Sequence, residues 1–217
     1  MKIKLKIAGI KRENGVQMKE LICAETLRLF SEEGYGNTSI RNIADAIKYS
    51  PGTIYLYYKD KDELLYAVQH HGFIKLMKKV KTGAKSLHPL KRLKQICRVY
   101  ILFGLENPNL YDLMFIVRAP KNIDDTQHKV NDESVIDYFQ NCVSDCIRQD
   151  FLYIDNFEHG YLQVWSMLHG LISLNLRCRL KILGPGEITP QTLITAIDNY
   201  IDTITKIDLF NVQNTPL

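Results

Sequence analysis

Residues 38–61 constrain the fold of this 217-residue chain most, because they hold two amphipathic runs separated by a short polar turn. In the first run, apolar residues recur at i, i+3, i+4 and i+7, at Ile40, Ile43, Ala44 and Ile47. This spacing is typical of a helix with one buried face. Thr38 or Ser39 supplies a hydroxyl that can cap its first turn.

A second helix is expected immediately after the turn, which residues 48–50 form. Ser50 offers an N-cap hydroxyl, and Pro51 takes the first helical position, where the missing N–H costs nothing. The run from Pro51 to Tyr58 is too short to be stable alone, so neighbouring helices must hold it. Two helices joined by a turn of three or four residues, the second short and rich in hydroxyls, indicate a helix-turn-helix.

The charge of the chain is divided unevenly along its length. Residues 1–105 hold 20 Lys and Arg against 9 Asp and Glu, whereas residues 106–217 hold 8 against 15, within a net charge of +4. A basic half joined to an acidic half favours a polyanion as the partner of the basic half. Residues 1–15 form a basic arm that is either a frayed terminus or a DNA-contacting segment.

Composition excludes several other classes of protein. The five cysteines are odd in number and lack framework spacing, which favours free thiols and a cytoplasmic location. No apolar run is long enough to span a membrane. Cys142 and Cys146 lie four residues apart, but no further ligand completes a metal site, so we expect no metal and no cofactor. We find no phosphate loop and no nucleophile elbow, and we predict that the chain is not an enzyme.

Helical spacing extends through the remainder of the chain, and we predict an all-α fold of about nine helices. Residues 119–128 are expected to form an exposed loop, and Gly184-Pro185-Gly186 a turn. The expected helices span residues 16–33, 40–47, 51–58, 60–81, 88–105, 109–118, 130–150, 157–183 and 190–207. The first three form a compact head.

Residues 20–66 resemble the DNA-binding head of the tetracycline-repressor (TetR) family of bacterial regulators. The resemblance is carried by Ile22 to Phe30, Gly34-Tyr35, Thr38 to Ala44, Gly52 to Tyr55 and Lys59 to Leu65. One departure is Tyr57-Tyr58, where the family often has His-Phe. Tyr58 can still fill the aromatic core position, whereas Tyr57 replaces a DNA-facing imidazole with a phenol.

The resemblance implies a set of DNA-contacting residues in and around the second short helix. Thr53 and Tyr57 would face the major groove, and Gly52 would let the backbone approach DNA closely. Phosphates would be held by Thr38, Tyr49, Tyr55 and Lys61. Lys48 and Ser50 lie on the same surface, and Leu56 can touch a thymine methyl. Core packing is the alternative for Tyr55. Bidentate readers are scarce here, so we expect specificity from apolar contacts, water and DNA shape.

A second resemblance lies in the later half, in residues 106–115 and in Trp165-Ser166-Met167-Leu168-His169-Gly170-Leu171. Both stretches look like the effector domain of the Trp–His–Gly subclass, which implies that this domain binds a small molecule and dimerises. A mostly apolar effector pocket would be lined by Phe103, Tyr111, Met114, Phe115, Phe139, Cys142, Trp165 and His169. Core filling explains these residues equally well. The dimer interface would be formed by Leu168, Ile172, Ile197, Tyr200, Ile201 and Ile204.

These features favour a regulator with an arm (residues 1–15), a DNA-binding head (16–66) and an effector-binding and dimerisation domain (67–217). Its partners would be double-stranded operator DNA, a second copy of itself and a largely apolar effector, with no membrane. Such a repressor would bind a palindromic operator as a homodimer, and an effector would release it. The alternative is a helical small-molecule carrier or enzyme whose basic head is incidental.

Overall fold

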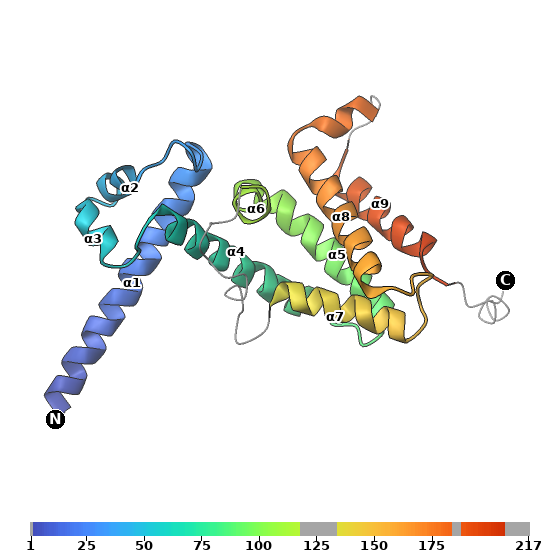
Figure 1. The fold of residues 1–217 in the computed structure, drawn as a ribbon, viewed down its shortest axis with the longest axis horizontal. Helices are drawn as coiled ribbons and strands as arrows, with labels where there is room; N and C mark the ends of the chain where they lie inside the picture. Colours follow the sequence, from blue (N-terminus) through green and yellow to red (C-terminus); the bar gives the residue numbers. More distant parts are fainter. Residues whose placement is uncertain (1, 118–133, 184–187, 207–217) are drawn as a thin grey trace. The chain divides into compact units, whose positions relative to one another are not determined.

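The computed structural model describes residues 2–117, 134–183 and 188–206, and the side chains of residues 2–14 are not described (Figure 1). Within these ranges the chain forms nine α-helices and no strand beyond an isolated bridge between Leu152 and Thr205. This confirms the all-α prediction. The helices are α1 (Lys2–Glu32), α2 (Ile40–Ala46), α3 (Pro51–Tyr55), α4 (Lys61–Gly83), α5 (Pro89–Glu106), α6 (Pro108–Phe115), α7 (Val135–Arg148), α8 (Phe157–Leu176) and α9 (Pro190–Thr203). A 3-10 helix (Arg179–Leu183) follows α8.

The described residues pack as two compact units. The first contains residues up to Ile74 together with residues 109–117, and the second contains residues 75–108 and all later described residues. Helix α6 therefore packs with the head rather than with the second unit. The domain boundaries expected at residues 15 and 66 remain predictions about function, because packing alone does not define them.

The first unit is built on capped short helices around an apolar core. Ser39 caps α2, accepting a hydrogen bond from the Asn42 N–H at 3.1 Å. Ser50 caps α3 by accepting from the Thr53 N–H at 3.2 Å, with Pro51 at the first helical position, as predicted. The core beneath them consists of fully buried side chains from each helix, namely Ile22, Ile43, Ala44, Ile54, Leu64 and Leu65.

Helix α6 docks on α4 through a close approach at Gly72. A Cβ atom at this position would lie 2.4 Å from Sδ of Met114, so only glycine fits without rearrangement. Nearby, Nε2 of the buried Gln69 donates to the Leu113 carbonyl oxygen at 2.9 Å, which satisfies a polar group inside the unit.

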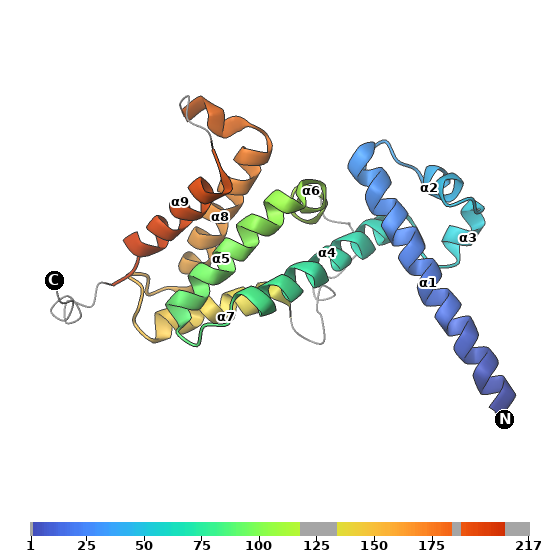
Figure 2. The same ribbon diagram turned by 180° about the vertical axis from the view of Figure 1, so that it is seen from behind.

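Helix α5 is the centre of the second unit, where it packs against α7, α8 and α9 (Figure 2). Its amphipathic sequence buries Leu93, Ile96 and Ile101. On the surface, Nη2 of Arg98 donates to Oδ2 of Asp198 on α9 at 2.6 Å. Such an exposed pair contributes about 0–1 kcal/mol, so the apolar contacts must supply most of the stability.

Several helix boundaries differ from the predicted ones for identifiable reasons. Helix α1 begins at Lys2 rather than near Val16, because the basic arm has no proline and tolerates helical geometry. Helix α3 ends at Tyr55 rather than Tyr58. Helix α8 ends at Leu176, because Cys178 adopts a positive φ of 54° that an α-helix cannot contain. The loop expected at 119–128 and the turn at 184–186 lie outside the described residues.

Candidate nucleic-acid interface

The turn between α2 and α3 is sharp because Lys48 adopts a left-handed conformation, with φ of 60°. This conformation costs a non-glycine residue roughly 1–2 kcal/mol, which the surrounding contacts must offset. The next N–H, that of Tyr49, donates to the Ala44 carbonyl oxygen at 2.9 Å and closes the turn. As a result, Lys48, Tyr49 and Ser50 all lie exposed at the start of α3.

Helix α3 presents apolar and hydroxyl groups outward from a buried anchor. Ile54 is fully buried and Tyr58 nearly so, which holds the short helix against the head. On the outer side, Leu56 is 81% exposed and Tyr55 is 55% exposed. The exposure of Tyr55 contradicts its core-packing alternative, whereas Tyr58 is a core residue as predicted. Tyr57 lies just beyond the end of α3, where its N–H donates to the Ile54 carbonyl oxygen at 2.9 Å.

Gly52 and Thr53 lie in the first turn of α3. The Thr53 hydroxyl is 3.1 Å from Oγ of Ser50, so the two hydroxyls share a hydrogen bond. A Cβ atom on Gly52 would meet only Oγ of Ser50 at 3.6 Å, an ordinary van der Waals distance. Among the described residues, the packing around α3 therefore leaves room for a larger side chain at position 52.

The predicted phosphate contact of Thr38 is wrong. Its side chain is only 2% exposed, and its hydroxyl lies 3.0 Å from the Gly34 carbonyl oxygen and 3.3 Å from that of Leu29. Thr38 therefore fastens the loop before α2 to the end of α1. Ser39, the other candidate cap, is the exposed residue that caps α2.

Lys61, at the start of α4, is held by an aromatic ring that the sequence pattern did not predict. Its Nζ lies 4.2 Å from the centroid of the Tyr35 ring, a distance typical of a cation–π contact. The Tyr35 hydroxyl donates to the Asp62 carboxylate, which fixes the ring in place. Partial burial lowers the pKa of Lys61. The only signal for this cluster in the sequence is the aromatic residue of the Gly34-Tyr35-Gly36 loop.

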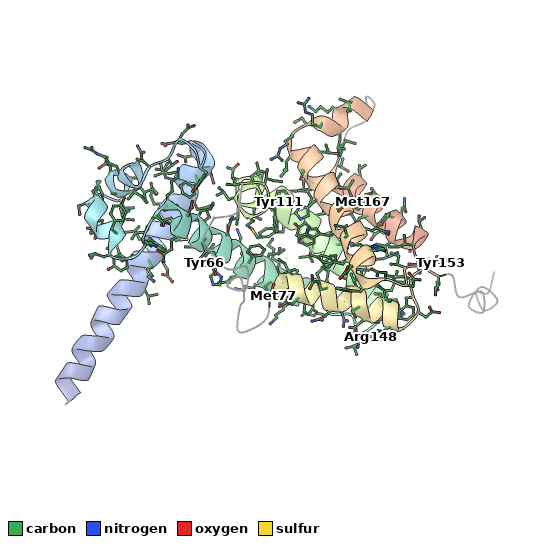
Figure 3. All side chains as sticks on the ribbon, viewed as in Figure 1. Tyr66, Met77, Tyr111, Arg148, Tyr153 and Met167 are labelled. Carbon is green, nitrogen blue, oxygen red and sulfur yellow. The ribbon has the colours of Figure 1, made fainter. Side chains whose placement is uncertain are left out.

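The eight predicted effector residues fall in both units. Tyr111, Met114 and Phe115 belong to α6, where Phe115 meets Phe73 at 5.5 Å between ring centroids; Tyr111 is labelled in Figure 3. The other five, in the second unit, are Phe103, Phe139, Cys142, Trp165 and His169. A cavity of about 10 Å³ beside Phe139 and Trp165 has room for about one water. Phe103 and Cys142 are packed in the core instead.

An aromatic cluster surrounds His169 in the second unit. Nε2 of His169 lies 3.0 Å from the Tyr100 hydroxyl, and its ring meets that of Trp165 edge-on at 4.6 Å between centroids. Phe139 and Tyr161 extend the cluster from Trp165. Burial lowers the pKa of His169 to about 4, so the imidazole is neutral at physiological pH.

The predicted dimer interface is wrong for four of its six residues. Leu168, Ile172, Ile197 and Ile201 are buried inside the chain, where they join α8 and α9 to the core; Tyr200 and Ile204 are partly exposed. A second stripe on α8, spaced by four residues, points outward instead and comprises Leu162, Ser166, Gly170 and Leu174. Leu162 is 59% exposed and Leu174 is 46% exposed.

The cysteines form no disulfide in this structure. Cys97, Cys142 and Cys146 are buried, Cys23 is half-buried, and Cys178 is exposed beyond the end of α8. Burial raises the pKa of the Cys23 thiol to about 11. In the part of the chain that the structure describes, no three His, Cys, Asp or Glu side chains gather as metal ligands would. None of the helices there has the length and apolar character needed to cross a membrane.

Two family models match the chain. A model described as "Bacterial regulatory proteins, tetR family" matches residues 22–68, the unit that carries α2 and α3. A second, described as "Tetracyclin repressor-like, C-terminal domain", matches residues 93–196. The first match confirms the resemblance found in the sequence. The Trp–His–Gly subclass remains a prediction.

Similar proteins support the same assignment. A helix-turn-helix-type transcriptional regulator of Haemophilus influenzae is 31% identical over 46% of this chain and 54% of its own length. The regulator YuxN of Bacillus subtilis is 26% identical over 88% of this chain and 64% of its own length. The chain thus spans less than two thirds of these curated relatives.

Solved structures share the fold. A Rhodococcus sp. RHA1 protein of unknown function superposes with a TM-score of 0.70 at 18% identity, over 87% of this chain and 95% of that one. A TetR family transcription regulator from Marinobacter aquaeolei VT8 gives 0.67 at 20% identity, over 90% of this chain and 98% of that one.

Proposed function

Because the chain belongs to the TetR family of bacterial regulatory proteins, we propose that it is a DNA-binding transcription regulator. The observation that carries this proposal is the surface of α3. Two large side chains, Tyr55 and Leu56, point away from a helix of five residues that Ile54 and Tyr58 anchor in the core. Large apolar groups exposed on a firmly held element indicate a partner, and the basic half of the chain favours DNA.

Each side chain around α3 has a distinct proposed task. Thr53 and Tyr57 read base edges in the major groove, and Leu56 meets a thymine methyl. Lys48, Tyr49, Ser50 and Tyr55 contact the backbone of the DNA and set the position of α3 on it. Lys61 exchanges its contact with Tyr35 for a phosphate. Because α3 carries no Arg, Asn or Gln, DNA shape must supply much of the specificity.

The proposed regulator acts as a homodimer on a palindromic operator. We place the contact between copies on the outward stripe of α8 formed by Leu162, Ser166, Gly170 and Leu174, together with the partly exposed Tyr200 of α9 and Ile204 just after α9. Small residues between two leucines let two helices approach closely. The two heads must then match half-sites about 34 Å apart, or a multiple of that distance.

The proposed effector is a largely apolar small molecule, and the chain acts as a repressor that the effector releases. Its site is the cluster of Tyr100, Phe139, Trp165 and His169, whose neutral imidazole can accept or donate one hydrogen bond. The cavity there has a volume of only about 10 Å³, so an effector must move these rings apart when it binds. Such a rearrangement is what could change the affinity for DNA. Its setting is the cytoplasm, where free thiols persist.

The test begins with selection of duplexes from a random DNA library by the wild-type protein, followed by binding measurements across a salt series. We expect a steep loss of affinity with salt, because phosphate contacts release counterions. Thr53→Ala and Tyr57→Ala should each weaken binding to the selected duplex by about 1–3 kcal/mol and relax the sequence specificity of the protein. Lys61→Ala should lower the salt slope by about 1. Thr82→Ala, an exposed change on α4, is the matched control.

Two results would contradict this proposal. A flat salt response would exclude a phosphate-based interface and favour the helical carrier or enzyme. Wild-type binding by all three head variants would show that α3 does not face DNA.

A further inference from the structure

A cavity of about 630 Å³ lies within the first unit, separate from the α3 surface and from the His169 cluster. One wall is formed by residues 19–27 of α1, and the other by Tyr58 and by residues 63–74 of α4. Tyr66, on the α4 wall, is labelled in Figure 3. The volume is in the range of sites that bind a small organic molecule.

The groove formed by this cavity is lined by apolar side chains and by the imidazole of His70. Cys23, Leu27 and Ala67 supply apolar surface, and Tyr66 stacks on His70 with 6.0 Å between ring centroids. Nδ1 of His70 is shielded from solvent and has no hydrogen-bond partner. A buried polar atom without a hydrogen-bond partner is unfavourable, so a ligand that supplies a partner for this nitrogen would gain binding free energy.

The protonation state of His70 narrows the chemistry of a ligand. Burial and the neighbouring His71 both lower the pKa of His70, so the ring is neutral at physiological pH. A neutral imidazole has one nitrogen that donates and one that accepts. Rotation of the imidazole by a half-turn about its Cβ–Cγ bond exchanges the positions of Nδ1 and Cδ2, and the backbone does not move. A hydroxyl group can pair with either nitrogen because it both donates and accepts.

We propose that this groove binds a small, uncharged apolar molecule that carries a hydroxyl group, with its apolar body between α1 and α4 and its hydroxyl paired with His70. The site differs from the effector site proposed in the second unit, because it lies in the head itself. Lys19, Glu20 and Glu63 at its rim balance to a charge of about −1, which offers no concentrated charge for an ionic ligand.

An occupant of the groove would act directly on the anchor of α3. Tyr58 lines the groove, its hydroxyl donates to the Lys19 carbonyl oxygen at 3.3 Å, and its N–H donates to the Ile54 carbonyl oxygen at 3.0 Å. A molecule that displaces the Tyr58 ring therefore moves a residue bonded to α3. This coupling to DNA rests on the proposed function, whereas binding to the groove does not.

The test uses 2-naphthol and naphthalene as probes of the full chain, in equilibrium dialysis without DNA. The wild-type protein should bind 2-naphthol about five-fold more tightly than naphthalene, the effect of one net hydrogen bond of about 1 kcal/mol. His70→Phe keeps a ring against Tyr66 and should abolish this difference. Ala24→Phe, at an exposed position of the groove wall, should lower the affinity for both probes about ten-fold.

Thr82→Ala serves as the control and should bind both probes like the wild type, and circular dichroism checks that each variant is folded. No saturable binding of 2-naphthol, equal affinity of the wild type for both probes, or binding that neither groove variant alters would each overturn the proposal. Because DNA is absent, failure of the proposed DNA-binding function would leave this result interpretable.

Discussion

Replacing Gly52 with alanine separates the demands of the fold from those of DNA. Gly52 lies in the first turn of α3, and among the described residues its Cβ would meet only Oγ of Ser50 at 3.6 Å, so the substitution introduces no clash with them. Alanine loses less backbone entropy than glycine in a helix. We therefore expect Gly52→Ala to raise the free energy of unfolding by about 0.5–1 kcal/mol.

Binding to DNA should change in the opposite direction. If the backbone at Gly52 contacts DNA, the added methyl group occupies a closely packed interface. Overpacking of such a site costs about 1–3 kcal/mol, which corresponds to a 5- to 150-fold loss of affinity. Urea titration measures the stability, and an electrophoretic shift assay on the selected duplex measures the affinity.

A matched control shows whether stability alone affects binding. Thr82→Ala removes an exposed side chain on α4 whose hydroxyl donates to the Lys78 carbonyl oxygen at 3.0 Å, and it should stabilise the helix by about 0.5 kcal/mol. Its affinity for DNA should equal that of the wild type. If Gly52→Ala binds DNA as tightly as Thr82→Ala does, α3 does not approach DNA at this residue and the reasoning fails.

Four further outcomes test other parts of the structure. Because burial lowers the pKa of His169 to about 4, the unfolded chain binds the proton more tightly than the folded chain between about pH 6.5 and 4. The free energy of unfolding should therefore fall by about 2 kcal/mol as the pH drops through that window, after allowance for partial exposure. His169→Gln should lack this loss in urea titrations. Thr38→Ala should lower the free energy of unfolding by about 1–2 kcal/mol and leave the salt dependence of DNA binding unchanged. A shallower salt dependence would show that Thr38 does contact a phosphate. A Cβ at Gly170 would meet no heavy atom of the described residues within 4 Å, apart from its chain neighbours and the backbone of its own helix, so Gly170→Leu should fold normally. It should weaken dimerisation at least ten-fold in sedimentation equilibrium, and an unchanged dissociation constant would exclude the α8 stripe. Lys48→Gly removes the strain of a positive φ and should stabilise the head by about 0.5 kcal/mol in urea titrations. The same change should weaken DNA binding because it removes a positive charge. A variant less stable than the wild type would contradict this.

Local chemistry made the head predictable from the sequence. Caps and turns act within three or four residues, so Ser50 and Pro51 determine where α3 begins regardless of the rest of the chain. The family resemblance, rather than these local rules, identified Tyr55 and Leu56 as DNA-facing candidates, and both side chains are exposed. Their roles on DNA depend on a partner and remain predictions.

Contacts between distant segments were not predictable in this way. The periodicity of α8 fits two stripes, one containing Leu168 and one containing Leu162, and nothing local shows which of them α5 and α9 cover. Thr38 was misassigned because its hydroxyl meets two carbonyl groups at the end of α1 and just after it, those of Leu29 and Gly34, which the helical spacing of the sequence does not indicate. The groove beside His70 depends on how far two helices diverge, which a hydrophobic pattern does not record.

The exposure of Cys178 gives the chain a native attachment point for a spectroscopic probe. Since the other thiols are buried or half-buried, a maleimide spin label should react first at this residue. In a homodimer the two labels would form a pair whose separation can be read by pulsed electron resonance. Changes in that separation on addition of DNA or a small molecule would follow the motion of the assembly without engineering a cysteine.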